Sequence, residues 1–157
     1  MRCFVQTHLD APAEKVWAAA KQSATLLYVT RGFLGFSGAN RMPTEWSVGT
    51  VFQTRFWFFH VIPAWWKHTL AVMRIEENQK KIVSHEGGGM IGVWNHAIQI
   101  SALPSGCNYL DDIEIKAGWL TPLIWLYANV FYRYRQARWR ELAKRIAGPV
   151  PYHSFFR

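Results

Sequence analysis

The stretch WLTPLIWLYANVFYRYRQARWRELAKRI, residues 119–146, decides the fold of this chain. It is the longest helix candidate in the sequence, and its first half is almost entirely apolar. A lone helix with so much apolar surface needs a large partner surface on which to bury it. We therefore expect the sequence upstream to form a sheet that receives this helix. The second half of the stretch is basic, with a single acidic residue, Glu141, among six cations: Arg133, Arg135, Arg138, Arg140, Lys144 and Arg145.

The composition indicates one globular domain followed by a short tail. A chain of 157 residues can bury a sizeable core without disulfides or metal ions. We expect residues 1–147 to form a single domain and residues 148–157, which begin with the helix-ending sequence GPVP, to form a tail. Half of the residues are hydrophobic and nine are tryptophan. Nine indoles cannot all be buried in one small core, so some should line a cavity or an interface.

The net charge of +8 and the pI near 9.8 are compatible with several anionic partners. No recognised nucleic-acid-binding motif accompanies the basic residues, so we expect no nucleic-acid partner. Peripheral contact with an anionic membrane stays open. So does the simpler interpretation that the basic helix half is a solvated face, favoured by the dipole at a helix C-terminus. Both a monomer and a homodimer agree with the sequence.

The cysteines and the apolar runs predict a soluble cytoplasmic protein. Cys3 and Cys107 are too few for a disulfide framework, and neither lies in a CxxC pattern. The sequence before Asp10 has no apolar run of signal-peptide length. The apolar run at residues 120–132 is shorter than the ~20 residues that a membrane-spanning helix needs.

Alternation of apolar and polar residues, punctuated by Gly, Pro and Asn, predicts seven strands. They are residues 2–9, 33–40, 51–60, 65–76, 81–86, 93–103 and 109–116. Two short helices should follow the first strand, at residues 12–22 and from Ser23 to about Gly32. Pro63 predicts a turn after the third strand, because it lacks a backbone donor and has a fixed φ.

Three of the predicted strands share one apolar phase, which should face the long helix. The apolar pairs are Leu70 and Val72, Ile98 and Ile100, and Ile113 and Ile115. The same phase places Trp66, His68, Trp94, His96 and Asp111 on the inner side. A buried polar group without a partner costs about 1–3 kcal/mol. The two histidines and Asp111 should therefore bond each other, water or a bound molecule.

The order of these elements resembles that of the START-like (SRPBCC) superfamily, in its polyketide cyclase/dehydrase and lipid-transport-like branch. The segment HLDAPAEKVW (residues 8–17) resembles the start of the superfamily, and YLDDIE (residues 109–114) resembles the acidic strand before its last helix. The segment EGGGMIGVWNH (residues 86–96) resembles a glycine-then-Trp-x-His segment, although it is richer in glycine. The resemblance implies an α+β helix-grip (pollen-allergen-like) fold. In that fold a seven-stranded curved antiparallel sheet wraps around a long C-terminal helix, with a hydrophobic cavity between them.

The first functional hypothesis is the binding or carriage of a hydrophobic small molecule, such as a lipid, a polyketide or an isoprenoid-like compound. An apolar cavity with few polar groups is the usual form of a small-molecule site. Aromatic residues at helical spacing are also typical of an ordinary core, so this alternative stays open. The residues expected to contact the ligand are Trp57, Phe59, Trp66, His68, Leu70, Trp94, His96, Ile98, Asp111, Ile113, Leu120, Ile124, Tyr127 and Phe131.

The second hypothesis is an enzyme of the cyclase or dehydratase type. His68, His96 and Asp111 are its candidate catalytic residues, with Asp111 orienting an imidazole that acts as general acid or base. The opposing interpretation is that both histidines are hydrogen-bonded structural groups. No HxxxH or CxxC spacing is present, and we expect neither a metal ion nor a cofactor.

The third hypothesis is a module that docks on a membrane or a protein through the basic helix half. The apolar segment HVIPAWW, residues 60–66, would assist by dipping into lipid headgroups.

Overall fold

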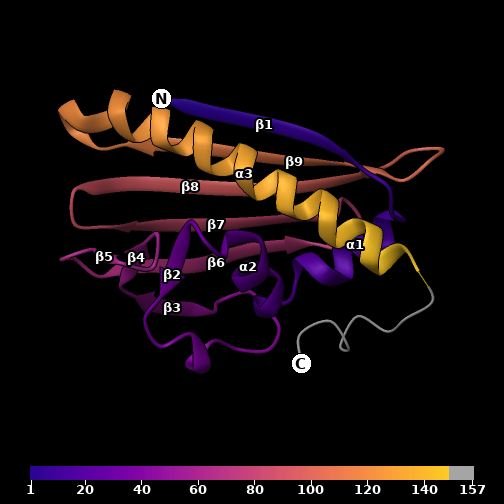
Figure 1. Ribbon diagram of the computed structural model, residues 1–157, viewed down its shortest axis with the longest axis horizontal. Coiled ribbons are helices and arrows are strands. Elements are labelled where there is room, and N and C mark those ends of the chain that lie inside the picture. Colours follow the sequence, from indigo (N-terminus) through magenta and orange to yellow (C-terminus); the bar gives the residue numbers. More distant parts are fainter. Residues whose placement is uncertain (149–157) are drawn as a thin grey trace.

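The computed structural model describes residues 1–148, which form a curved sheet with a long helix lying across one face (Figure 1). The helices are α1 (Ala13–Ala20), α2 (Ser23–Thr30) and α3 (Thr121–Ala147). The strands are β1 (Arg2–Leu9), β2 (Leu34–Phe36), β3 (Val51–Thr54), β4 (Phe56–Phe58), β5 (Ile62–Pro63), β6 (His68–Glu76), β7 (Lys81–Gly88), β8 (Ile91–Ala102) and β9 (Cys107–Lys116). The predicted α+β class and helix-grip arrangement are confirmed. The tail predicted at residues 148–157 lies, beyond Gly148, outside the described residues.

The prediction of seven strands is wrong, because residues 1–148 contain nine. Six form the main antiparallel sheet in the order β1-β9-β8-β7-β6-β3, and the other three form a small sheet in the order β2-β4-β5. The predicted strand at residues 51–60 breaks at Arg55, where the Thr54 hydroxyl bonds the carbonyl oxygens of Ser37 and Arg55. The predicted turn contains β5, where Pro63 is tolerated because an edge strand leaves some backbone donors unused.

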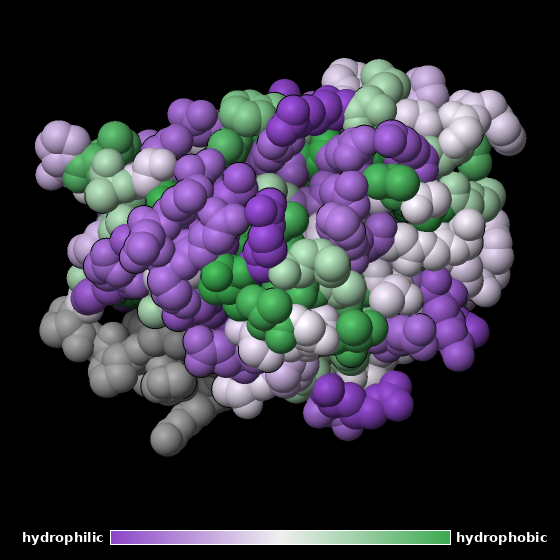
Figure 2. Space-filling model, turned by 180° about the vertical axis from the view of Figure 1, so that it is seen from behind, coloured by the Kyte–Doolittle hydropathy of each residue, from purple (hydrophilic) through white to green (hydrophobic). Residues whose placement is uncertain are grey.

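The inner face of the main sheet has the phase that the sequence predicts. Val72, Ile98, Ile100, Ile113 and Ile115 are all buried beneath α3 or the short helices. Figure 2 shows the opposite side of the molecule, away from α3, where hydrophilic side chains cover much of the surface. The sheet thus has one polar face exposed to solvent and one apolar face turned to the core, as antiparallel sheets commonly do.

The basic half of α3 is not a uniformly solvated face, and this expectation needs correction. Arg133, Arg140, Lys144 and Arg145 are exposed, but Arg135 is only 5% exposed and points into the protein. Its guanidinium lies 3.7 Å from the carboxylate of Asp111 on β9. A buried cation is tolerated only when an anion or hydrogen-bond acceptor compensates it, and Asp111 provides that compensation.

Cys3 and Cys107 are both free and buried. No helix within residues 1–148 combines the length and the apolar run that crossing a bilayer would need.

Candidate ligand cavity

A cavity of about 540 Å³ lies between the main sheet and the first half of α3. Its walls are mostly apolar. The sheet contributes Leu70, Val72, Ile82 and Ile98; α3 and the residue before it contribute Leu120, Ile124, Tyr127 and Phe131; and β4 contributes Phe56 and Phe58. The volume and the lining are those of a site for a small organic molecule.

The cavity opens at one end of the molecule. Four of its lining residues are also strongly exposed to solvent: Phe59, Ile62, Met90 and Leu123. They come from the β4–β5 connection, β5, the β7–β8 turn and the start of α3, which lie together at the left-hand end of Figure 1. A residue that both lines a cavity and reaches solvent marks its mouth, so we place the opening among these side chains.

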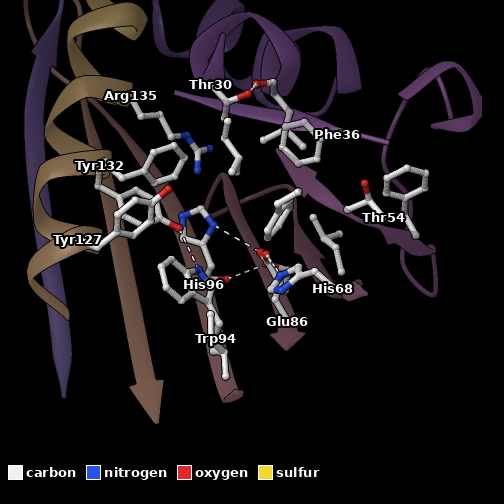
Figure 3. A pocket seen from close by; sticks show the side chains of 18 of the residues that line it. Thr30, Phe36, Thr54, His68, Glu86, Trp94, His96, Tyr127, Tyr132 and Arg135 are labelled. Carbon is white, nitrogen blue, oxygen red and sulfur yellow. Dashed lines mark hydrogen bonds and ion pairs between the residues drawn. The ribbon is translucent and has the colours of Figure 1, made fainter. Parts of the chain in front are cut away.

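A carboxylate flanked by two imidazoles is the main polar feature of the cavity wall. Figure 3 shows Glu86 between His68 and His96. The Nε2 atom of His68 lies 3.2 Å from Oε2 of Glu86, and Nδ1 of His96 lies 3.9 Å from Oε1. The hydroxyl of Ser84 also donates to Oε1, over 2.8 Å. Strand pairing explains the grouping, since Ser84 on β7 lies opposite His96 on β8.

Behind His96 lies a second, fully enclosed carboxylate. The Nε2 atom of His96 is 2.8 Å from Oδ1 of Asp111, which has no exposed surface. Gln136 on α3 donates to Oδ2 of Asp111 over 3.2 Å, and the hydroxyl of Tyr109 donates to Oδ1 over 3.3 Å. Arg135 completes this group and donates to the Tyr109 oxygen. The polar groups thus run continuously from the interior under α3 to the cavity wall.

Both carboxylates are ionised at neutral pH. Burial raises the pKa of Glu86, but the hydrogen bond from His68 and the charges of His68 and His96 lower it more. Burial likewise raises the pKa of Asp111, and the Arg135 charge and the hydrogen bond from His96 outweigh that effect. Burial raises the pKa of the Tyr132 phenol, which therefore stays protonated beside them. An ionised carboxylate only accepts hydrogen bonds, so the Nε2 atoms of both histidines carry the protons.

One ring nitrogen of His68 takes no part in the hydrogen bonds of the cluster. Its side chain is 3% exposed, and its Nδ1 atom is buried without a hydrogen-bond partner among residues 1–148. With Nε2–H directed to Glu86, the Nδ1 atom is the acceptor of this imidazole whenever the ring carries a single proton. The carboxylate therefore fixes both the tautomer and the orientation of this imidazole.

Most of the predicted ligand-contacting residues line the cavity, namely Phe59, Trp66, His68, Leu70, Trp94, His96, Ile98, Leu120, Ile124, Tyr127 and Phe131. Three do not. Trp57 points away from it and donates from its indole to the Ser37 hydroxyl. Asp111 and Ile113 are fully buried behind the cavity wall. The three candidate catalytic residues are connected, because Glu86 lies between His68 and His96 and His96 pairs with Asp111, but only the two histidines reach the cavity wall.

The sequence interpretation missed Glu86 and Arg135. Glu86 could have been found, because Ile82, Ser84 and Glu86 alternate along one strand and share the inward phase of Ile82. Arg135 lies one helical turn beyond Phe131, on the same side of α3. Its placement depends on a carboxylate opposite, which the helix alone does not disclose. The described residues hold no group of three His, Cys, Asp or Glu side chains arranged as metal ligands.

At the level of sequence, no protein-family model and no curated protein matches this chain. Solved structures do resemble it. A protein from Chromobacterium violaceum has a TM-score of 0.70 at 14% identity, over 90% of this chain and 96% of that one. A START superfamily protein from Mycobacterium smegmatis has a TM-score of 0.67 at 13% identity, over 92% and 98%. Norcoclaurine synthase from Thalictrum flavum, in complex with dopamine and hydroxybenzaldehyde, has a TM-score of 0.62 at 11% identity, over 92% and 87%.

These identities are too low to transfer an activity, but the shared architecture covers nearly the whole chain. The protein has a START-like helix-grip fold, as its sequence resemblance implied. Folds of this kind host unrelated functions, so function has to be argued from the site.

Proposed function

We propose that the protein binds and carries a hydrophobic small molecule in the cavity between the main sheet and α3. The observation that carries this proposal is a mostly apolar cavity of about 540 Å³ that opens to solvent at one end. A core that served stability alone would be packed with few voids larger than a water molecule. Among the structures that share the fold, norcoclaurine synthase was solved in complex with two small molecules, dopamine and hydroxybenzaldehyde, which agrees with a role in ligand binding.

The polar cluster suggests which ligands fit. Within it, Glu86 has the most accessible side chain, 12% exposed against 3% for His68 and 6% for His96. An ionised carboxylate offers about four acceptor sites, and Ser84 and His68 occupy only part of them. A ligand with an apolar body and one hydrogen-bond donor, such as a hydroxyl group, would therefore satisfy both the walls and Glu86. Hydroxylated isoprenoid, polyketide and lipid molecules belong to this class.

Extraction of the purified protein with organic solvent, followed by mass spectrometry, tests this proposal. We expect an apolar compound bearing a hydroxyl or similar donor, recovered in proportion to the protein. Glu86→Gln should weaken retention of that compound, whereas Glu114→Gln, on the outer face, should not. Extracts free of any such compound, together with no binding of an added apolar dye, would count against the proposal.

The paired His68 and Glu86 support a second candidate, an enzyme of the cyclase or dehydratase type. When the His68 ring carries a single proton, its Nδ1 atom is an acceptor next to an apolar cavity, and Glu86 orients the ring, as a general base requires. His96, held by Asp111, could return a proton. A carrier releases its ligand unchanged, whereas an enzyme converts it. His68→Gln should then abolish conversion while leaving ligand affinity within a few-fold of the wild type.

A cytoplasmic location and either a monomeric or a homodimeric state stay predictions from the sequence. Docking through the basic half of α3 gains little support, since Arg135 points inward and binds Asp111. Contact with a membrane has better support at the cavity mouth.

A further inference from the structure

Large apolar side chains surround the mouth of the cavity and face solvent. Trp119 is 87% exposed and Trp65 is 77% exposed, although indoles in soluble proteins are usually well buried. We call the following set the mouth rim: Phe59, Val61, Ile62, Trp65, Met90, Trp119, Leu123, Leu126 and Val130. Each of these residues is more than one-third exposed. Exposed apolar side chains gathered at one end of a molecule are typical of an interaction site.

The rim residues come from three segments that lie at one end of the molecule: the β4–β5–β6 connection, the β7–β8 turn and the start of α3 (Figure 1). Side-chain contacts hold these segments together. The ring of Phe33 lies 5.0 Å from that of Phe59 and 5.6 Å from that of Tyr127 on α3. A Cβ built on Gly89 in the β7–β8 turn would lie 2.3 Å from the indole of Trp66. The three segments therefore meet at the opening, where Phe59, Ile62, Met90 and Leu123 line the cavity and the other rim residues lie close to them in sequence.

The start of α3 is apolar on two sides, and the protein covers only one of them. Leu120, Ile124, Tyr127 and Phe131 line the cavity. Trp119, two residues before α3, and Leu123, Leu126 and Val130 within it have the same spacing of three or four residues and remain exposed. The exposed stripe therefore continues from the cavity mouth along the outside of its lid.

The charges near the rim are positive. Arg55 and Lys67 are exposed, and the sequence between them contains no acidic residue. The turn at residues 87–93 is uncharged, and residues 116–126 contain only Lys116, which pairs with Glu114. In a symmetric pair of copies joined by this surface, Arg55 and Lys67 of both copies would be brought together, which is unfavourable. An anionic surface would instead attract them.

We propose that the mouth rim docks on the surface of an anionic lipid bilayer. Trp65 and Trp119 would lie among the headgroups, where indoles are favoured, and Arg55 and Lys67 would meet lipid phosphates. The opening of the cavity would then face the acyl chains, so that an apolar ligand could enter or leave without crossing water. The inference rests on the proposed binding function, because docking in this orientation is useful only if the cavity holds such a ligand.

Flotation with vesicles tests the docking surface. One set of vesicles contains phosphatidylcholine alone, and the other contains phosphatidylcholine with phosphatidylglycerol. We expect the wild type to float with the anionic vesicles and to bind more weakly as salt is raised. Lys67→Glu should lower the partition coefficient about tenfold. Lys144→Glu, which makes the same charge change in the last turn of α3, should have little effect.

The aromatic part of the rim is tested by a Trp65→Ser, Trp119→Ser double variant. Far less of this variant should float with the anionic vesicles, whereas Phe4→Ser and Met73→Ser, at exposed positions outside the rim, should float as the wild type does. If the double variant folds poorly, the single Trp119→Ser variant replaces it in the flotation assay, because Trp119 is 87% exposed and its loss should disturb the fold little. Failure of the wild type to float, or equal losses in rim and control variants, would overturn the inference. A rim-dependent dimer in sedimentation velocity without flotation would overturn it too.

The binding function is followed separately with Nile red in buffer without vesicles. The rim variants should bind the dye in the cavity as the wild type does. If flotation fails while the cavity binds Nile red, the docking inference falls and the proposed function stands. If the cavity does not bind the dye and extracts of the protein contain no apolar compound, the proposed function falls, whatever the vesicles show.

Discussion

The Nε2 atom of His96 lies 2.8 Å from Oδ1 of Asp111, whose side chain has no exposed surface. The same carboxylate accepts a hydrogen bond from Gln136 and lies 3.7 Å from the guanidinium of Arg135. Asp111 therefore compensates polar groups from β8 and from α3 at once. The position of the imidazole at the cavity wall depends on an anion that no ligand can reach.

Asp111→Ala should strongly destabilise the fold. It leaves the buried Arg135 without its anion and His96 without its acceptor, and breaking a buried pair in this way costs about 3–5 kcal/mol. Asp112→Ala is the matched control, because the Asp112 carboxylate, next in sequence, faces outward and pairs with the exposed Arg2. That change should leave the free energy of unfolding nearly unaltered. Urea denaturation of both variants measures the difference, and equal losses would contradict this role for Asp111.

The free energy of unfolding should fall as the pH is lowered through about 4. The folded-state pKa values of Glu86 and Asp111 lie below their ordinary values, because nearby cations and hydrogen bonds outweigh burial. The unfolded chain therefore binds protons before the folded chain does, and acid favours unfolding. The stabilisation is present above the unfolded pKa values and disappears below the folded ones. Urea denaturation across this range should show a shallower acid slope for Glu86→Gln than for the wild type.

The two buried thiols predict that the free energy of unfolding also falls at alkaline pH. Burial raises the pKa values of Cys3 and Cys107 to about 11. The folded chain then holds these protons after the unfolded chain has lost them, so stability should fall as the pH rises from about 9 to 11. Ellman's reagent at pH near 8 should label the folded protein slowly and the denatured protein rapidly. Rapid labelling of both thiols in the folded state would contradict their burial.

Two glycines beside the β7–β8 turn should differ in their tolerance of substitution: Gly88 at the end of β7 and Gly92 in β8. Gly88 has φ +147°, and a Cβ there would lie 2.1 Å from the carbonyl oxygen of Lys67. Gly88→Ala should therefore cost at least about 2 kcal/mol, from backbone strain and collision with the Lys67 backbone just before β6. Gly92→Ala, where the nearest atom is 3.5 Å away, should change stability by less than about 1 kcal/mol. Thermal unfolding of the two variants compares them directly.

Much of the fold could be predicted from the sequence, because the strongest patterns lie in its longest elements. The apolar alternation of β8 and β9 and the length of α3 determined the sheet, its inner face and the helix that covers it. The error came where strands are short. Whether residues 51–60 form one strand or two depends on pairing with β2 and β5, which is a tertiary contact and leaves no local period.

The candidate site was predicted in part, for a related reason. Strand phase alone places His68 and His96 on the inner face, and the structure brings both to the cavity wall. Phase alone does not show that Asp111 lies behind the wall, because that depends on how closely α3 approaches β9. Trp57 was misplaced because the aromatic run FWFF suits both faces equally. In the structure, Phe58 points into the cavity, and Phe59 follows it through a positive φ of 51°.

Narrowing the cavity tests the central claim most directly. Ile124 and Leu126 lie on the same turn of α3, but only Ile124 lines the cavity, while Leu126 is 57% exposed. In Ile124→Trp the indole would fill ligand space, whereas Leu126→Trp would place it in solvent. Nile red titrated in buffer without vesicles, with circular dichroism to confirm folding, should bind the wild type and Leu126→Trp with similar affinity. Ile124→Trp should bind it far more weakly. Equal affinity of all three proteins for the dye would contradict a ligand site between the sheet and α3.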